Sequence, residues 1–240
     1  MKLIKYIPDV ITALNVVCGV IGVIFAFKGS FETAFALMLL AAVFDFCDGL
    51  AARALDAYSD LGKELDSLCD LVSFGVLPSV MLYKLMCVCS FSESVFCLIP
   101  LVITVFSALR LAKFNVDKRQ TETFLGLPTP ACAMLCGSLC QFVAHNPGCF
   151  LADWAAGPVF IPVLSVVLSA LLVCEIPMFS MKFKRGHGAG VIGWKRITFF
   201  VLVIAAVIVA FLFRLDWSFA VMVSFLLYIV KNVVYWLAKV

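Results

Sequence analysis

The chain has 240 residues, of which 64% are hydrophobic and only 14% are charged, with a net charge of +3 and a mean hydropathy of +1.12. Soluble domains are about half apolar and about a quarter charged, so this composition excludes an ordinary water-soluble protein and favours one surrounded by lipid. In hydrocarbon the backbone must satisfy its own hydrogen bonds. Because the apolar runs are about 20 residues long and do not alternate with polar residues, they predict membrane helices rather than a β-barrel.

Eight apolar stretches predict an all-α integral membrane protein with about eight spans. The expected spans are 8–27, 33–55, 64–86, 94–114, 129–145, 157–179, 197–213 and 217–238. A short interfacial helix is expected before the first span. We divide the chain into a six-span core at 1–180, a basic loop at 181–196 and a pair of C-terminal membrane helices at 197–240.

The basic residues indicate the orientation in the membrane. With the N-terminus in the cytoplasm, and with Lys231 left out because it falls inside the eighth expected span, fourteen Lys and Arg fall at cytoplasmic ends. Only Lys28, Lys84 and Arg214 fall on the other side. This bias follows the positive-inside rule, so we expect both termini on the cytoplasmic side and an even number of spans. The basic loop at 181–196 is then expected to contact lipid headgroups.

The eleven cysteines have no spacing typical of a metal site. Cys132, Cys136 and Cys140 recur every four residues and share one face of a predicted helix. We interpret them as small residues that pack between helices. The sequence gives no indication of a nucleic-acid partner.

Acidic residues gather where the second and third spans meet. Seven of the fifteen lie between Asp45 and Asp70, and acids in a membrane helix are costly enough to indicate a function. Asp45 and Asp48 are three residues apart and Asp66 and Asp70 are four apart, so each pair shares a helical face. A turn at 56–61 makes the two helices antiparallel neighbours. We therefore expect the four carboxylates to meet just beneath the cytoplasmic surface.

Four carboxylates in a poorly solvated site repel one another unless a cation compensates, and oxygen ligands favour Mg²⁺, Mn²⁺ or Ca²⁺ over zinc. Gly49 and Ala52 leave an opening on the same face, and Arg53 offers a planar fork suited to phosphate. Together these residues predict phosphoryl-group transfer, in which metal neutralises charge and a carboxylate takes a proton. The alternative is a solvated helical turn whose acids pair with Arg53 and Lys63. Three acids near the turn are assigned to it: Asp56, Asp60 and Glu64.

The stretch from Asp45 to Asp70 matches the pattern Asp-x2-Asp-Gly-x2-Ala-Arg-x8-Gly-x3-Asp-x3-Asp at every fixed position. This pattern resembles the signature of the CDP-alcohol phosphotransferases, integral membrane enzymes with a six-helix core that usually dimerise. The resemblance implies that the four aspartates hold one or two divalent cations, that Asp66 and Asp70 are catalytic, and that Asp70 is also the general base. It implies that the CDP moiety is contacted by Gly49, Ala52, Arg53 and Gly62.

Segments outside the motif, at 7–15, 71–78, 110–115 and 124–130, resemble the bacterial branch of this family that makes phosphatidylserine. The resemblance implies transfer of a phosphatidyl group from CDP-diacylglycerol to L-serine, with CMP as product, by a homodimer on the cytoplasmic side of a bacterial inner membrane. One departure is Pro8-Asp9, where family members often have Pro-Asn. Candidates for binding the acceptor or the lipid phosphate are Ser73, Arg110, Lys113 and Asn115. Arg110 and Lys113 are equally compatible with positive-inside anchors, and Ser73 with a serine bonded to its own helix.

Three alternatives stay open at this point. One is a non-catalytic relative of the family, although every position of the motif is intact. A sister enzyme that uses glycerol phosphate or inositol phosphate would share the aspartate motif but would need more basic residues around the acceptor. A cation transporter would also place acids in the membrane, although transporter sites lie near the midplane of paired repeats. The acids here cluster at one end of two helices, and no second, matching half is visible in the sequence.

Overall fold

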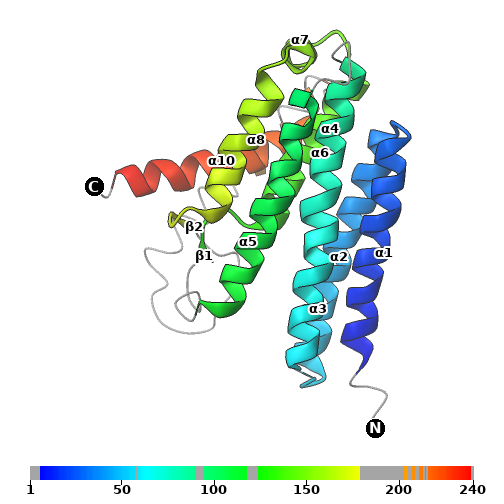
Figure 1. The fold of residues 1–240 in the computed structure, drawn as a ribbon, viewed down its shortest axis with the longest axis vertical. Helices are drawn as coiled ribbons and strands as arrows, with labels where there is room; N and C mark the ends of the chain where they lie inside the picture. Colours follow the sequence, from blue (N-terminus) through cyan, green and yellow to red (C-terminus); the bar gives the residue numbers. More distant parts are fainter. Residues whose placement is uncertain are drawn as a thin grey trace.

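The computed structural model describes residues 6–57, 59–89, 95–117, 124–178 and 216–238, together with residues 203–204, 207–208, 211–212 and 214. The described chain is almost entirely helical, with one short two-stranded ribbon (Figure 1). Its elements are α1 (Ile7–Phe27), α2 (Phe31–Ala54), α3 (Asp60–Asp70), η2 (Leu71–Val76), α4 (Leu77–Cys89), η3 (Val95–Leu101), α5 (Val102–Val116), β1 (Phe124–Leu125), α6 (Thr129–His145), α7 (Phe150–Ala156), α8 (Phe160–Val173), β2 (Pro177–Met178) and α10 (Trp217–Leu237).

Five helical stretches are long and apolar enough to cross a membrane, which confirms the predicted membrane-helix class. They are Ile7–Phe27, Phe31–Ala54, Asp60–Cys89, Val95–Val116 and Trp217–Leu237. The pair α7 and α8 would make a sixth if it counts as one span, although its two helices meet at a bend of 88°. The basic loop and most of both the expected seventh span and the N-terminal interfacial helix lie outside the described residues. The count of eight and the cytoplasmic placement of both termini therefore stay predictions.

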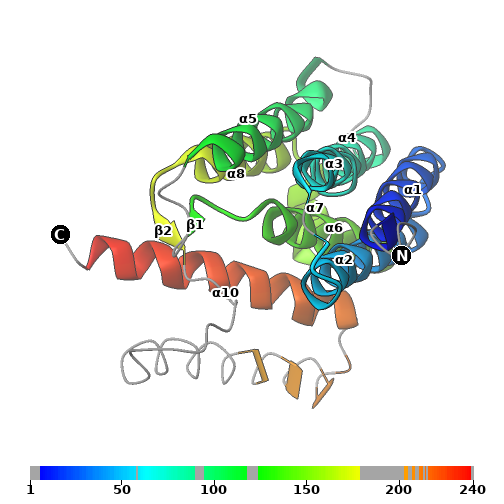
Figure 2. The ribbon, with the colours of Figure 1, turned by 90° about the horizontal axis from the view of Figure 1, so that it is seen from below.

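Helix α6, the expected fifth span, is the centre of the packing. It has 17 residues, nearly all of them buried, and it contacts α2, α4 and α10. Seen along the bundle, α6 lies among the other helices, whereas α10 crosses them at a steep angle (Figure 2). Phe35 of α2 stacks on Trp217 of α10, with ring centroids 5.4 Å apart. The three buried cysteines of α6 are part of this core, as their helical spacing predicted.

The end of the expected sixth span differs from the sequence-based prediction of a helix to residue 179. Helix α8 ends at Val173, and β2 then pairs antiparallel with β1, placing Met178 opposite Phe124. Pro177 explains the early end, because proline lacks an N–H and disfavours helical geometry in the residue before it. The ribbon ties the segment between α5 and α6 to the end of α8.

Gly126 makes the close approach at this ribbon feasible. Its φ is +79°, and its N–H donates to the carbonyl of Ile176 at 3.0 Å. A Cβ at this position would lie 2.5 Å from the carbonyl oxygen of Leu172. Glycine is therefore needed here both for its backbone conformation and for the space.

The stretch Asp60–Cys89 is one long helix that changes geometry in the middle. Helix α3 continues directly into η2, a π-helix, and then into α4. The carbonyl oxygen of Gly75 in η2 accepts a hydrogen bond from the hydroxyl of Thr104 in α5 at 3.2 Å. Single π-helical turns inside α-helices occur often at functional sites, and this one begins immediately after Asp70.

Candidate functional site

Three of the predicted metal ligands come together between α2 and α3, two helices that both pack against α1. Each of Asp45, Asp48 and Asp66 offers a carboxylate oxygen within 4.8 Å of the other two. Asp48 is buried and the other two are half-buried. Helical spacing put each pair of aspartates on one face, and the tight turn between α2 and α3 brings the two faces together. The structure thus brings three of the four predicted carboxylates together, and their role as metal ligands stays a prediction.

Asp70 occupies a different position from the other three aspartates. It does not belong to the group within 4.8 Å, but it lies near enough to Asp45, Asp48 and Asp66 for their charges to repel its own. Its side chain is buried, and its Oδ1 accepts a hydrogen bond from Nδ2 of Asn15 at 3.3 Å. The fourth carboxylate is thus adjacent to the cluster but held separately, by a neutral donor from another helix.

Helix α1 supplies the hydrogen-bond donors behind the aspartates. The hydroxyl of Thr12 donates to Oδ2 of Asp48 at 2.6 Å and also lies 3.0 Å from the carbonyl of Pro8. Thr12 and Asn15 are both buried and share one face of α1. The candidate residues chosen from the sequence did not include either side chain. The available signal was their three-residue spacing on the stripe of α1 that contains Gly19.

The residues expected to contact CDP lie at the end of α2 and at the start of α3, the two helices that carry the aspartates. Arg53 is exposed, and its Nε donates to the carbonyl of Gly49 at 2.8 Å. A Cβ on Gly49 would meet only the guanidinium of Arg53, at 4.0 Å, so the space above it is open. Ala52, one helical turn after Asp48 in α2, is half-buried.

Gly62 lies where α3 meets the start of α1. Its N–H donates to the hydroxyl of Ser59, which caps α3, at 2.9 Å. A Cβ on Gly62 would lie 3.0 Å from Oδ1 of Asp9. The unusual Pro8-Asp9 pair of this sequence therefore faces Gly62.

The residues predicted to bind the acceptor divide into two groups. Arg110 of α5 is buried beside the cluster: it donates to the hydroxyl of Thr129 at 2.8 Å and lies close enough to Asp70 for their charges to attract. Its Nε is buried with no hydrogen-bond partner among the described residues. Ser73 is fully buried, and its hydroxyl donates to the carbonyl of Asn15 at 3.0 Å, so it joins η2 to α1.

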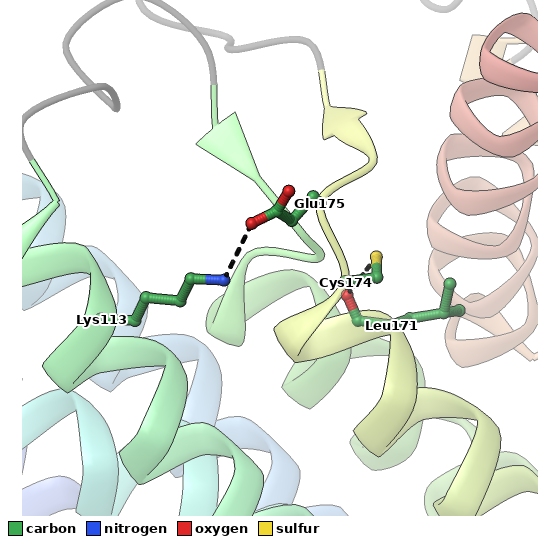
Figure 3. A network of polar contacts seen from close by, with 4 residues as sticks. All are labelled: Lys113, Leu171, Cys174 and Glu175. Atoms are coloured by element: carbon green, nitrogen blue, oxygen red, sulfur yellow. Dashed lines mark hydrogen bonds and ion pairs between the residues drawn. The ribbon is translucent and has the colours of Figure 1, made fainter.

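Lys113 and Asn115 make contacts with neighbouring helices instead. The Nζ of Lys113 lies 3.5 Å from a carboxylate oxygen of Glu175, just after α8 (Figure 3). Asn115 donates through Nδ2 to the hydroxyl of Ser67 at 3.0 Å and to the carboxylate of Glu64 at 3.2 Å, joining α5 to α3. Of the predicted acceptor residues, Arg110 is thus the one that the structure places against the aspartates with a nitrogen still to be satisfied.

The carboxylates fit a hard divalent cation. All three residues of the compact group offer oxygen atoms, the donors that Mg²⁺, Mn²⁺ and Ca²⁺ prefer. Without a cation, three carboxylates this close would repel one another in a half-buried setting. The side chain of Thr12 fixes one of them from behind, as supporting residues do for metal ligands.

A comparison with known protein families identifies the family of this chain. A model of the CDP-alcohol phosphatidyltransferase domain matches residues 5–171, which cover α1 to most of α8. The chain belongs to this family. Every residue of the aspartate motif and every supporting donor from α1 lies inside the matched region, whereas α10 of this CDP-alcohol phosphatidyltransferase lies beyond it.

Three named relatives are similar to this chain. The chain is 36% identical over 143 residues to a CDP-diacylglycerol–serine O-phosphatidyltransferase of Bacillus subtilis, covering 60% of this chain and 78% of the relative. It is 34% identical over 186 residues to the protein of the same name from Mycobacterium tuberculosis, covering 74% of this chain and 62% of the relative. It is 36% identical over 135 residues to an archaetidylserine synthase of Methanothermobacter thermautotrophicus, covering 55% and 56%. The chain thus spans less than two thirds of the last two relatives.

Proposed function

We propose that this protein is a phosphatidylserine synthase, which transfers the phosphatidyl group of CDP-diacylglycerol to the hydroxyl of L-serine and releases CMP. The observation that carries the proposal is the convergence of Asp45, Asp48 and Asp66 beside a separately held Asp70, in a family defined by CDP-alcohol chemistry. The relatives named for serine favour serine as the acceptor.

The proposed reaction is a displacement at the phosphorus atom that carries the diacylglycerol. The serine hydroxyl oxygen forms a bond to this phosphorus, and the bond from the phosphorus to the bridging oxygen breaks. CMP leaves with that oxygen, and the hydroxyl proton passes to the carboxylate of Asp70. A carboxylate within reach of the hydroxyl makes it a better nucleophile, and the hydrogen bond from Asn15 keeps Asp70 in place.

We infer that a divalent cation, Mg²⁺, Mn²⁺ or Ca²⁺, is held by Asp45, Asp48 and Asp66, with Asp70 completing the site when the substrate is bound. Such an ion neutralises the charge of the phosphates during transfer. Arg53 would bind the phosphates from the exposed side, and Gly49, Ala52 and Gly62 leave space for the nucleotide. The position of Asp9 next to Gly62 puts an acidic side chain at the expected nucleotide contact.

Arg110 is the proposed partner of the serine carboxylate. Its guanidinium is buried beside Asp70 with Nε unsatisfied, so a planar carboxylate could accept from it. The same nitrogen could bind the lipid phosphate instead. Lys113 and Asn115, engaged with Glu175 and with α3, would then act by placing α5.

The proposal also covers the domain organisation of the protein and its place in the cell. We infer a catalytic core at 1–180, followed by the basic loop at 181–196 and the C-terminal helices at 197–240, in the cytoplasmic membrane of a bacterium. The substrate site would face the cytoplasm, and the family resemblance implies a homodimer. These inferences rest on the distribution of basic residues and on the resemblance, and the membrane-length helices support the multi-pass arrangement.

An assay of acceptors tests the reaction. Purified protein is given CDP-diacylglycerol, Mg²⁺ or Mn²⁺, and labelled serine, glycerol 3-phosphate or inositol. We expect CMP and a serine-containing phospholipid to form in equal amounts. CMP release with glycerol 3-phosphate or inositol, but not with serine, would assign the protein to a sister activity. Metal uptake into vesicles without CMP formation would favour transport.

A pair of variants on one helix tests the proposed base. Asp70→Asn keeps the size of the side chain and its place beside Asn15 but removes the proton acceptor. We expect turnover to fall roughly 10²- to 10⁴-fold, the usual contribution of general base catalysis, while CDP-diacylglycerol binding measured by equilibrium dialysis in detergent is largely retained. Asp60→Asn, at the exposed start of α3, should leave turnover unchanged. An active Asp70→Asn enzyme would remove Asp70 from the role of base.

A further inference from the structure

A second polar site lies at the opposite end of the bundle from the aspartates. A cavity of about 390 Å³ opens where the start of α2, the end of α6 and the start of α10 meet. Glu32 and Asp48 are both on α2 and are separated by about 24 Å at the rise of an α-helix. We call this space the far-end cavity, and its lining residues are Glu32, Gln141, His145, Asn146, Arg214, Asp216 and Trp217.

The lining of the far-end cavity is polar and carries both signs of charge, with acidic side chains in excess. Glu32 and Asp216 supply two carboxylates, whereas Arg214 supplies a cation and His145 a ring that can donate a hydrogen bond. One carboxylate oxygen of Asp216 caps α10 by accepting from the N–H of Ser218 at 3.1 Å, which leaves its second oxygen for another donor. A cavity with both signs of charge favours a ligand that also carries both.

Gln141 is independent evidence that the far-end cavity binds a ligand. This residue is only 3% exposed, yet its Oε1 is buried without a hydrogen-bond partner among the described residues. A buried acceptor without a donor costs free energy, and a buried glutamine near the end of a largely apolar helix is expected to have a partner. A ligand that donates N–H at the inner end of the cavity would satisfy it.

A metal ion is a poorer occupant than an organic cation. Among the described residues, the Asp45, Asp48 and Asp66 group is the one set of three possible metal ligands within 4.8 Å, so the acids of the far-end cavity are not gathered tightly enough. Arg214 on the same cavity would also repel a bare cation. A ligand that carries both an ammonium and a phosphate can pair with the separated carboxylates and with Arg214 at the same time.

We propose that the far-end cavity binds the headgroup of a zwitterionic aminophospholipid. Its ammonium donates to Gln141 and to the carboxylates of Glu32 and Asp216, and its phosphate pairs with Arg214. Trp217, stacked on Phe35, lines the cavity with an amphipathic ring of the kind found at membrane surfaces. This site is separate from the aspartates and does not depend on the proposed function.

The test measures lipid retention by native mass spectrometry of the purified protein in detergent. The protein is titrated with phosphatidylethanolamine, with phosphatidylglycerol and with soluble phosphoethanolamine. We expect phosphatidylethanolamine to bind at least tenfold more tightly than phosphatidylglycerol, which lacks the ammonium. Glu32→Gln and Gln141→Leu should each weaken it roughly tenfold, the loss of one charge-assisted hydrogen bond. Asp153→Asn, an exposed acid of α7 outside the cavity, is the matched control and should change nothing.

Several outcomes would overturn the proposal. Equal retention of the two lipids by the unaltered protein would remove the requirement for an ammonium. Binding of phosphoethanolamine as tight as that of the lipid would assign the site to a soluble ligand. Unchanged binding in both Glu32→Gln and Arg214→Gln, two exposed positions that should not affect folding, would place the lipid elsewhere. Asp48→Asn should leave lipid retention intact, so failure of the catalytic proposal remains distinguishable.

Discussion

Thr12 and Asn15 show how much of the site depends on residues outside the aspartate motif. Each reaches across from α1 to one buried carboxylate, Asp48 or Asp70. A carboxylate that loses such a donor can turn away from the position in which it meets its neighbours. The aspartates therefore depend on α1 for their geometry, although α1 contributes no acid to the compact group.

The first prediction concerns this support. Thr12→Val preserves the shape of the side chain but removes the hydroxyl that donates to Asp48. We expect the Mn²⁺ concentration needed for half-maximal activity to rise about ten- to hundredfold, the usual effect of losing a group that orients a metal ligand. Thr12→Ser keeps the hydroxyl and should behave like the unaltered enzyme. If the two variants show the same metal dependence, the hydrogen bond has no part in metal binding.

The second prediction separates two basic residues of α5. Arg110 is buried next to Asp70, whereas Lys113 is 38% exposed and paired with Glu175. We expect Arg110→Gln to raise the KM for serine at least tenfold, because a charged hydrogen bond to the carboxylate is lost. Lys113→Gln should change it less than twofold, because exposed ion pairs contribute little.

Varying both substrates distinguishes the two roles open to Arg110. A rise in the KM for CDP-diacylglycerol with an unchanged KM for serine would assign Arg110 to the lipid phosphate. Equal effects of the Arg110 and Lys113 substitutions on serine would contradict the distinction between the buried and the exposed cation.

At the scale of whole elements, close packing between α1 and the long third helix positions Asp70. A Cβ at Gly19 would lie 2.3 Å from Oγ and 2.9 Å from Cα of Ser73, the residue that bonds to the carbonyl of Asn15. Small residues allow membrane helices to approach this closely. The contact fixes η2, and hence the helix that continues from Asp70, against α1.

The third prediction tests this approach. Gly19→Ala would normally favour a helix, yet we expect it to destabilise the protein by about 1–3 kcal/mol, the usual cost of overpacking. Its Cβ collides with backbone atoms that cannot move aside. A lower midpoint of thermal unfolding in detergent is the measurement. Gly148→Ala adds the same methyl group where nothing lies within 4 Å and should have little effect.

The difference between predicted and observed elements has local causes. Fixed spacing within single helices predicted the co-facial aspartates, since helical geometry alone decides which residues share a face. Hydropathy cannot show that Pro177 ends the sixth expected span and begins a strand, because Ile176 and Met178 are as apolar as the helix before them. Nor can it show the π-helical turn at 71–76, which depends on contacts with α1 and α5.

At the scale of the whole molecule, contacts between helices that are distant in the chain could not be predicted from the sequence. Asn15 meets Asp70 across 55 residues of chain, and Arg110 meets Thr129 across 19. Those pairings depend on which helices are neighbours, which a single sequence does not specify. Basic residues and apolar length identified the membrane class, but the steep crossing of α10 over α6 had no counterpart in the pattern of residues (Figure 2).

The final prediction concerns the thermal stability of the whole helical bundle. Without a cation, the clustered carboxylates of α2 and α3 repel one another and oppose the packing of these helices. An ion that binds only the folded state stabilises it by about 2.7 kcal/mol at one hundred times its dissociation constant. We therefore expect Mn²⁺ to raise the thermal midpoint of the unaltered protein and EDTA to lower it again.

Two asparagine variants determine where that stabilisation arises. Asp48→Asn removes one ligand and part of the repulsion, so its midpoint without metal should be no lower than that of the unaltered protein, and Mn²⁺ should raise it little. Asp56→Asn alters an exposed acid at a φ of +47°, a conformation that asparagine tolerates well. It should respond to Mn²⁺ like the unaltered protein. An equal Mn²⁺ response in all three proteins would mean that the ion stabilises the bundle somewhere other than between α2 and α3.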